Sequence, residues 1–179
     1  MIDQREAVAY HEAGHAVVSM KLGYRCLYVT ITPDGSRLGH ACCEDPLIGG
    51  HDHNIEHALK VLIAASVAEG RHVGSRTWGD ADDRVKATNL ALSATDRDAE
   101  RAEVLINEMI GEARKLVEQH WPDIEALAHG RKLNWGGREH TKNSASAVSA
   151  ANLTLVRSHQ PVRAPFTLDA KRRNRPTQE

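Results

Sequence analysis

Two histidines and a glutamate near the N-terminus have the residue types and the spacing needed to bind and use a metal ion. Residues 11–15 read His-Glu-Ala-Gly-His, so on a helix His11 and His15 lie one turn apart on the same face. Two imidazoles at this spacing bind one zinc ion, and Glu12 beside them is a candidate general base. Catalytic zinc takes a third protein ligand and leaves a position for water, whose pKa the metal lowers to about 7. The motif favours zinc chemistry over a pair of ordinary surface or core histidines, but the third ligand must come from elsewhere.

The composition describes an ordinary globular chain and excludes several classes of protein. Apolar residues make up 41% and charged residues 26% of the 179 residues, as in typical soluble domains. No run approaches 18 apolar residues, so we expect no membrane segment, and no signal peptide is visible. Three cysteines do not make a disulfide framework, so a cytoplasmic location is the default expectation. Aromatic residues are scarce, at 4%, which favours closely packed helices.

The elements around the motif are expected to be a helix and a β-hairpin. The helix should run from Asp3 to about Leu22, with both histidines on its inward face. The segment 26–33 alternates in period two and predicts a strand with Leu27, Val29 and Ile31 facing the core. A turn at 33–36 leads to a second short strand at 37–43. The hairpin either presents an edge to an extended peptide or only covers the core.

The rest of the chain is expected to be helical. Helices are predicted at about 54–71, from the aspartate cluster at 80–83 onward, at 97–119 and at 123–133. Small residues at 64–68 make the first of these thin enough to pack closely on the helix at Gly14. The aspartates suit a helix N-terminus, and they are also the densest supply of carboxylates for a metal. The fold class is therefore mainly α, with a small β-hairpin next to the zinc helix.

Two basic or histidine-rich stretches are weaker candidates for binding. His51, His53 and His57 form a patch that favours a polar helix start over a second metal site, because no acidic or cysteine partner has a fixed spacing with them. Residues 151–179 hold six basic and two acidic residues. We expect 141–179 to be a polar, basic tail, partly disordered, and nucleic-acid binding is unlikely because interleaved aromatic residues are missing.

Taken together, these segments resemble the peptidase domain of the FtsH-type ATP-dependent zinc metalloproteases. Residues 9–16, Ala-Tyr-His-Glu-Ala-Gly-His-Ala, look like the zinc helix of that family. Residues 29–35, Val-Thr-Ile-Thr-Pro-Asp-Gly, are similar to its strand and turn. The Ala68-Glu69 pair, the segment 79–88 and the helices at 116–133 follow in the family's order. The resemblance covers about residues 1–140 and implies a zincin-like helical metallopeptidase domain there.

The resemblance also implies the roles of the site residues. His11, His15 and Asp83 would be the zinc ligands, and Glu12 the base that activates the zinc-bound water. Glu69 competes with Asp83 as third ligand, because a downstream helical glutamate fills that role in other zincins. Arg84, where the family has an apolar residue, could compete for the Asp83 carboxylate.

The implied function is a zinc metalloendopeptidase acting on flexible or unfolded polypeptides. No Walker-type phosphate loop is present, so this sequence shows no ATP site, and we expect an enzyme without its own ATPase. The family assembles into hexameric rings, which leaves self-association open. The alternative is a non-catalytic, metal-containing binding or regulatory module. The intact glutamate in the motif argues against that alternative, because such a module does not need Glu12.

Overall fold

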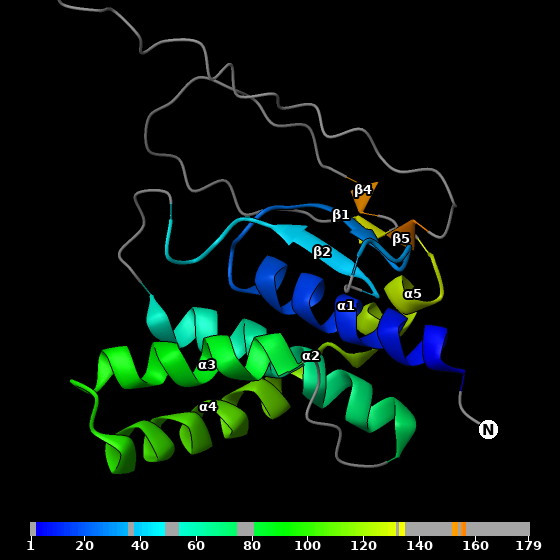
Figure 1. The fold of residues 1–179 in the computed structure, drawn as a ribbon. Helices are drawn as coiled ribbons and strands as arrows, with labels where there is room; N and C mark the ends of the chain where they lie inside the picture. The colour runs from blue at the N-terminus through cyan, green and yellow to red at the C-terminus, as the bar shows by residue number, and fades with distance from the viewer. Residues whose placement is uncertain are drawn as a thin grey trace, which may run out of the picture.

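The computed structural model describes residues 3–35, 38–48, 54–74, 81–131, 133–134, 152–153 and 155–156. The mainly α fold with a small hairpin is confirmed (Figure 1). In chain order the elements are α1 (Gln4–Lys21), β1 (Cys26–Thr30), β2 (His40–Cys43), α2 (Ile55–Val73), α3 (Ala81–Ala94), α4 (Ala99–Gln119), α5 (Trp121–Ala128), β3 (Leu133–Asn134), β4 (Asn152–Leu153) and β5 (Leu155–Val156).

Helix α1 lies at the centre of the fold, between the hairpin, α2 and α5 (Figure 1). It begins after Asp3, whose carboxylate accepts a hydrogen bond from the backbone N–H of Arg5, as a helix N-cap does. It ends at Lys21, and Gly23 follows with φ of 98°, a left-handed conformation that favours glycine. Neighbouring elements cover several sides of α1. Apart from the two histidines, all ten residues from Ala9 to Met20 are therefore buried.

The contact between α1 and α2 depends on small residues. A Cβ atom added at Gly14 would lie 2.9 Å from the carbonyl oxygen of Ala64 and 2.9 Å from the Cβ of Ala68. Ala64, Ala65 and Ala68 are fully buried there. The expectation that the thin helix after residue 54 packs against Gly14 is therefore confirmed, and the close approach explains why a glycine occupies a helix interior despite its low helix propensity.

The hairpin differs from the predicted alternation at one residue. Strands β1 and β2 pair antiparallel, with Cys26 opposite Cys43 and Tyr28 opposite Cys42. Leu27 is thus an extra residue on β1, a β-bulge. Val29 and Ile31 are buried as expected, but Leu27 is 60% exposed. Its predicted place in the core is wrong because a bulge shifts the faces of a strand by one residue.

A disulfide joins Cys26 to Cys43 at the open end of the hairpin. The sequence alone did not indicate a cross-link among three cysteines. The reason is visible in the strand register. Adjacent residues of a strand point to opposite faces, so Cys43 lies opposite Cys26 while Cys42 stays a free thiol.

The strands in the C-terminal segment join the hairpin. The sheet order is β2-β1-β5, with β5 parallel to β1, while β4 pairs with β3. Strands β4 and β5 belong to the segment 141–179, where we expected a polar tail. The division of the chain at residue 140 stays a prediction. Among the strands of the described residues, β2 is at the edge of this sheet, with β1 as its neighbour.

Helix α4 packs against α2 and α3, and α5 packs against α1 (Figure 1), so that both contribute apolar side chains to the core around α1. Asp98 caps α4 by accepting hydrogen bonds from the backbone N–H groups of Glu100 and Arg101. Helix α5 begins at Trp121, two residues before the predicted start, because proline is accepted in the first turn of a helix, where its missing N–H has no partner to lose.

Within the residues that the structure describes, none of the helices has the length and apolar character needed to cross a lipid bilayer. The expected cytoplasmic location stays a prediction.

We expect Gly14→Ala to destabilise the protein. The added methyl group meets helix backbone, which cannot move locally, so the overpacking should lower the free energy of unfolding by about 1–3 kcal/mol. Gly111→Ala is a matched control, because nothing lies within 4 Å of a Cβ at this position in α4 and alanine favours the helix. Thermal denaturation of the three proteins tests this, and equal melting temperatures for Gly14→Ala and wild type would contradict it.

Candidate metal centre

Helix α1 places His11 and His15 one turn apart, with ring centroids 4.9 Å from one another and ring planes at 84°. His11 is only 7% exposed. The predicted inward orientation of this helix face is therefore confirmed. Both rings point away from the centre of α1 toward α2 and α3, the two helices that supply the remaining polar groups of the site.

Helix α2 fixes the orientation of both rings through their Nδ1 atoms. His15 Nδ1 lies 3.0 Å from the carbonyl oxygen of Val61, and His11 Nδ1 lies 3.0 Å from Oε2 of Glu69. A carbonyl oxygen only accepts hydrogen bonds, so Nδ1 of His15 carries the proton and donates. The same holds for His11 against an ionised carboxylate. In the neutral rings, the Nε2 atoms then carry the lone pairs.

Asp83, in the first turn of α3, faces both of these lone pairs. Its Oδ2 lies 3.2 Å from Nε2 of His11 and 2.9 Å from Nε2 of His15. Within the described part of the chain, these three residues are the group whose ligand atoms gather within 4.8 Å of one another. Three acceptor atoms directed at one point need a proton or a cation between them.

The donor set fits zinc. Two imidazole nitrogens and one carboxylate oxygen are a known catalytic zinc combination. Ligand atoms at about 2.0–2.1 Å from a tetrahedral zinc lie roughly 3.3 Å apart; here Oδ2 of Asp83 lies 3.2 and 2.9 Å from the two Nε2 atoms, and the ligand atoms of the three residues all lie within 4.8 Å of one another. Each histidine also has a hydrogen-bond acceptor on its other nitrogen, which is the usual second shell of a zinc-binding histidine.

The two alternatives for the third ligand occupy different places. Asp83 lies on the Nε2 side of the histidines, whereas Glu69 accepts from Nδ1 of His11, on the far side of the ring. The geometry therefore favours Asp83. Arg84 is exposed, and the basic group that contacts Asp83 is Lys86, whose Nζ lies 3.4 Å from Oδ1. Oδ2 remains directed at the histidines.

The charges in this cluster shift the pKa values of its members. Burial favours the neutral form of His11, but hydrogen bonds to Asp83 and Glu69 outweigh burial and raise its pKa to about 9. For Asp83, burial is likewise outweighed by the hydrogen bonds from His11 and His15, which hold the carboxyl pKa well below its usual range. Without a metal, His11 is thus protonated at neutral pH beside the ionised Asp83 carboxylate.

Glu12 lies beside the cluster and under the hairpin. It is 8% exposed, and its carboxylate accepts a hydrogen bond from the backbone of Ala41 in β2. Burial raises its pKa, and the neighbouring imidazoles of His15 and His11 oppose only part of that increase. A carboxylate whose pKa is raised is a stronger base than a free one, which suits proton transfer near neutral pH.

A cleft of about 640 Å³ runs past the cluster between α1, β2, α2 and α3. Its walls include the metal-ligand candidates, Glu12, Gly39 and the β2 residues His40, Ala41 and Cys43, and the apolar residues Leu47, Ala58, Val61, Leu62 and Leu90. The cleft therefore brings the edge of a strand, a base and the three potential ligands to one place.

Sequence reasoning missed three contributions to the site: the Val61 carbonyl, the Ala41 backbone N–H and the close approach of Gly39. None has a sequence signal, because backbone groups are present at every position. Of the histidine patch, His51 and His53 lie outside the described residues. His57 interacts with the Tyr24 hydroxyl, with 2.9 Å between Nδ1 and the oxygen.

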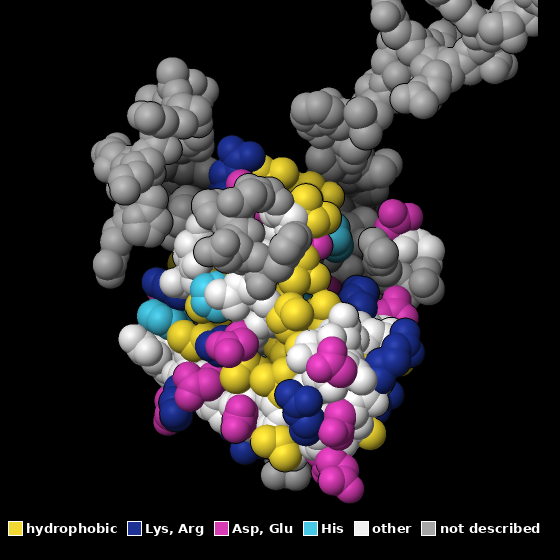
Figure 2. Space-filling model, turned by 90° about the vertical axis from the view of Figure 1, so that its left-hand side faces the viewer, with side chains coloured by type: hydrophobic (Ala, Val, Ile, Leu, Met, Phe, Trp, Pro, Cys, Tyr) yellow, Lys and Arg dark blue, Asp and Glu magenta, His cyan; other side chains and the backbone are white. Residues whose placement is uncertain are grey.

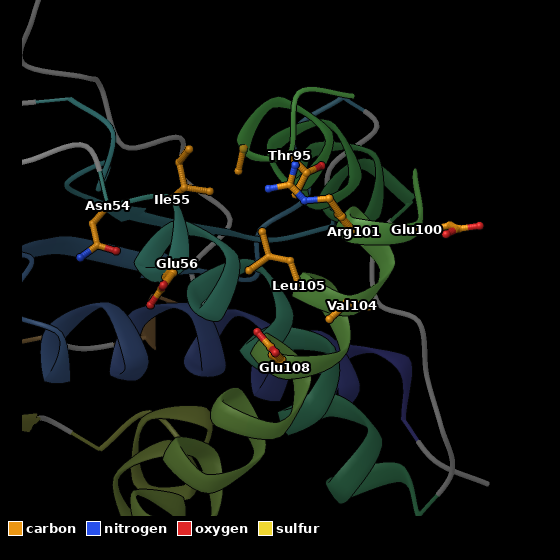
Figure 3. Close-up of a pocket in the computed structure, with 10 residues that line it drawn as sticks. Asn54, Ile55, Glu56, Thr95, Glu100, Arg101, Val104, Leu105 and Glu108 are labelled. Carbon is orange, nitrogen blue, oxygen red and sulfur yellow. The ribbon is translucent and has the colours of Figure 1, made fainter. Parts of the chain in front are cut away.

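A second, larger hollow of about 880 Å³ lies where α2 begins and α3 leads into α4. Ile55 and Leu105 point into it, with Arg101 nearby (Figure 3). Figure 2 faces this side and shows apolar side chains along its middle with acidic and basic side chains around them. Among the described residues the hollow contains no group of potential metal ligands, so it offers no comparable chemistry.

In the metal-free protein we expect His11 to titrate with a midpoint of about 9. Its pKa is raised on folding, so the protonated ring stabilises the fold fully below pH 6.5 and this stabilisation is lost as the pH rises through 9. NMR titration after chelator treatment gives the midpoint. By linkage, the melting temperature should be lower at about pH 9.5 than at about pH 7. In Asp83→Asn the midpoint should fall, and a wild-type midpoint near 6.5 would contradict the assignment.

Comparison with known proteins places the chain in a family of peptidases. Residues 2–97 match Peptidase family M41. The chain is 38% identical over 98 residues to the ATP-dependent zinc metalloprotease FtsH 1 of Symbiobacterium thermophilum. This alignment covers 52% of this chain and 16% of that protein. The corresponding FtsH of Lactococcus lactis is 34% identical over 94 residues, covering 50% and 14%, and that of Opitutus terrae is 36% identical over 95 residues, covering 50% and 16%.

The chain thus spans about a sixth of the length of these relatives. The matched range 2–97 contains every residue of the cluster, from His11 to Asp83. The resemblance to FtsH-type peptidase domains is confirmed, and this chain belongs to peptidase family M41.

Proposed function

We propose that this chain is a zinc-dependent endopeptidase that hydrolyses peptide bonds in flexible or unfolded polypeptides. The observation that carries the proposal is the convergence of ligand atoms of His11, His15 and Asp83 within 4.8 Å, beside a buried glutamate in an open cleft. Membership of a peptidase family supports the reaction class.

The proposed chemistry divides between the metal and Glu12. Zinc, held by His11, His15 and Asp83, would polarise the scissile carbonyl and make water more acidic. Glu12 accepts the proton of the attacking water at its carboxylate while the water oxygen bonds to the carbonyl carbon. When the C–N bond breaks, the protonated Glu12 gives this proton to the leaving amine. Burial of Glu12 keeps the carboxylate basic enough for the first transfer.

The edge of β2 suits an extended substrate. Strand β2 is an edge strand among the described strands, and its residues His40, Ala41 and Cys43 line the cleft. An extended peptide can pair with such an edge through backbone hydrogen bonds. These bonds depend little on the side chains of the peptide. A folded protein does not expose its backbone in this way, so the proposed substrates are flexible or unfolded chains.

We expect Glu12→Gln to bind zinc but to lose hydrolysis. The amide keeps the shape of the side chain but cannot accept a proton, so the rate should fall by about 10²–10⁴-fold. Release of fluorescent fragments from labelled casein measures the rate, and elemental analysis measures zinc. Glu108→Gln, on the exposed face of α4, is the matched control and should match wild type.

The same experiment separates the enzyme from a non-catalytic binding module. Chelator-sensitive cleavage by wild type that Glu12→Gln lacks supports the enzyme. A wild-type protein that binds zinc but cleaves nothing would favour the module, and cleavage retained by Glu12→Gln would show that the proposed mechanism is wrong.

We expect Asp83 and Glu69 variants to affect zinc differently. Asp83→Asn removes a proposed ligand charge and should lower zinc affinity by more than about 100-fold, whereas Glu69→Gln weakens only the support of His11 and should cost about 10–100-fold. Competition with a fluorescent chelator gives both affinities. Asp82→Asn, one residue away, is the control and should bind zinc within a few-fold of wild type. The reverse order for Asp83 and Glu69 would make Glu69 the ligand.

A further inference from the structure

Gly39 lies immediately before β2, where the hairpin passes over Glu12. A Cβ atom added at Gly39 would lie 2.8 Å from Cγ of Glu12, 2.8 Å from its Oε1 and 2.8 Å from Cγ1 of Val8. All three distances are shorter than van der Waals contact, where carbon atoms pack at about 3.5–4.0 Å. Gly39 does not have the positive φ seen at Gly23 and Gly35. Its lack of a side chain is therefore needed for space and not for backbone conformation.

The neighbours of Gly39 differ in kind from those of Gly14. At Gly14 an added methyl group meets the backbone of Ala64 and Ala65, which cannot yield without separating two helices. At Gly39 it meets the side chains of Glu12 and Val8. Moving a χ angle by about 30° from its rotamer costs about 0.5–1.5 kcal/mol, so the protein can accommodate alanine at position 39 by moving the Glu12 side chain.

Two backbone features of the hairpin together hold this carboxylate. Ala41 donates a backbone hydrogen bond to Glu12, and Gly39 leaves the space in which the rest of the side chain lies. The carboxylate is thereby kept in the cleft that also contains His11, His15 and Asp83. No other group on the hairpin needs to touch the metal ligands for this to work.

We propose that Gly39 is a positioning residue for the reaction, because its missing side chain sets where the Glu12 carboxylate lies relative to the metal ligands. This inference rests on the proposed function for its kinetic consequence, but not for its structural one. A displacement of about 1 Å at a reacting group can cost roughly 100-fold in rate. A side chain at position 39 would therefore lower kcat without contacting the substrate's reacting atoms.

The test compares Gly39→Ala with wild type in zinc content, stability and steady-state kinetics on a fluorogenic flexible peptide. We expect kcat to fall by about 10–100-fold, with KM, zinc stoichiometry and melting temperature close to wild type. Gly111→Ala, with nothing within 4 Å of the new methyl group, is the matched glycine control and should keep wild-type kcat. Unchanged kcat in Gly39→Ala, a loss confined to KM, or a loss of zinc would overturn the proposal.

A double-mutant cycle shows whether the effect passes through Glu12. Glu12→Asp shortens the side chain that meets the new methyl group, so Gly39→Ala should cost less in that background than in wild type. Val8→Ala makes room on the other side of the methyl group, away from the base. Relief by Val8→Ala without any non-additivity with Glu12→Asp would place the effect at Val8 and not at Glu12, and would overturn the proposal.

A crystal structure of zinc-loaded Gly39→Ala keeps this inference separate from the proposed activity. If wild type shows no hydrolysis, the proposed function fails, yet the position of the Glu12 carboxylate can still be compared between the two proteins. A displaced carboxylate with the three zinc ligands in place supports the role of Gly39. A carboxylate that superposes on the wild-type one overturns it.

Discussion

The close contact of α1 with α2 is the constraint on which the rest of the site depends. The two helices run antiparallel. His11 contacts Glu69 near the end of α2, and His15, one turn further along α1, contacts Val61, which lies earlier in α2. Gly14 lies against the small residues between these two contacts. If the helices were separated by a larger side chain, both Nδ1 atoms would lose their acceptors together. The small residues at the helix contact thus determine how the imidazoles are oriented.

The orientation matters because it creates an electrostatic requirement. Once α2 accepts the Nδ1 protons, two lone pairs and one carboxylate oxygen face each other in a buried place. Burying such groups without a partner is costly, so the site must hold either protons or a cation. The raised pKa of His11 and the lowered pKa of Asp83 are the protonated solution. A divalent metal is the other solution, and metal and proton therefore compete for the same atoms.

The features predictable from the sequence were those set by local spacing. The two histidines, the glutamate and the helix that carries them follow from a five-residue motif, and the helices after residue 54 follow from periodicity. The third ligand did not follow from spacing, because Asp83 and Glu69 lie in helices brought to α1 by tertiary packing; only the family resemblance pointed to Asp83. The prediction that Leu27 faces the core was wrong because one bulged residue changes which side chains of a strand lie on which face. Ala41 acts through its backbone N–H and Gly39 by leaving space for Glu12, and neither role could be predicted from the residue type alone.

The surroundings of α1 explain why its sequence lacks a clean amphipathic pattern. One side holds the metal-ligand candidates, α2 covers the side at Gly14, and the hairpin covers Glu12. Helix α5 covers a further side with Ile124 and Leu127, which are fully buried. These last contacts lie beyond residue 97, where the family match ends. A helix buried on all sides has no stripe facing water, so the polar residues that α1 keeps inside must each have a partner or a ligand. Among them, His11, Glu12 and His15 each have a partner in α2, α3 or the hairpin.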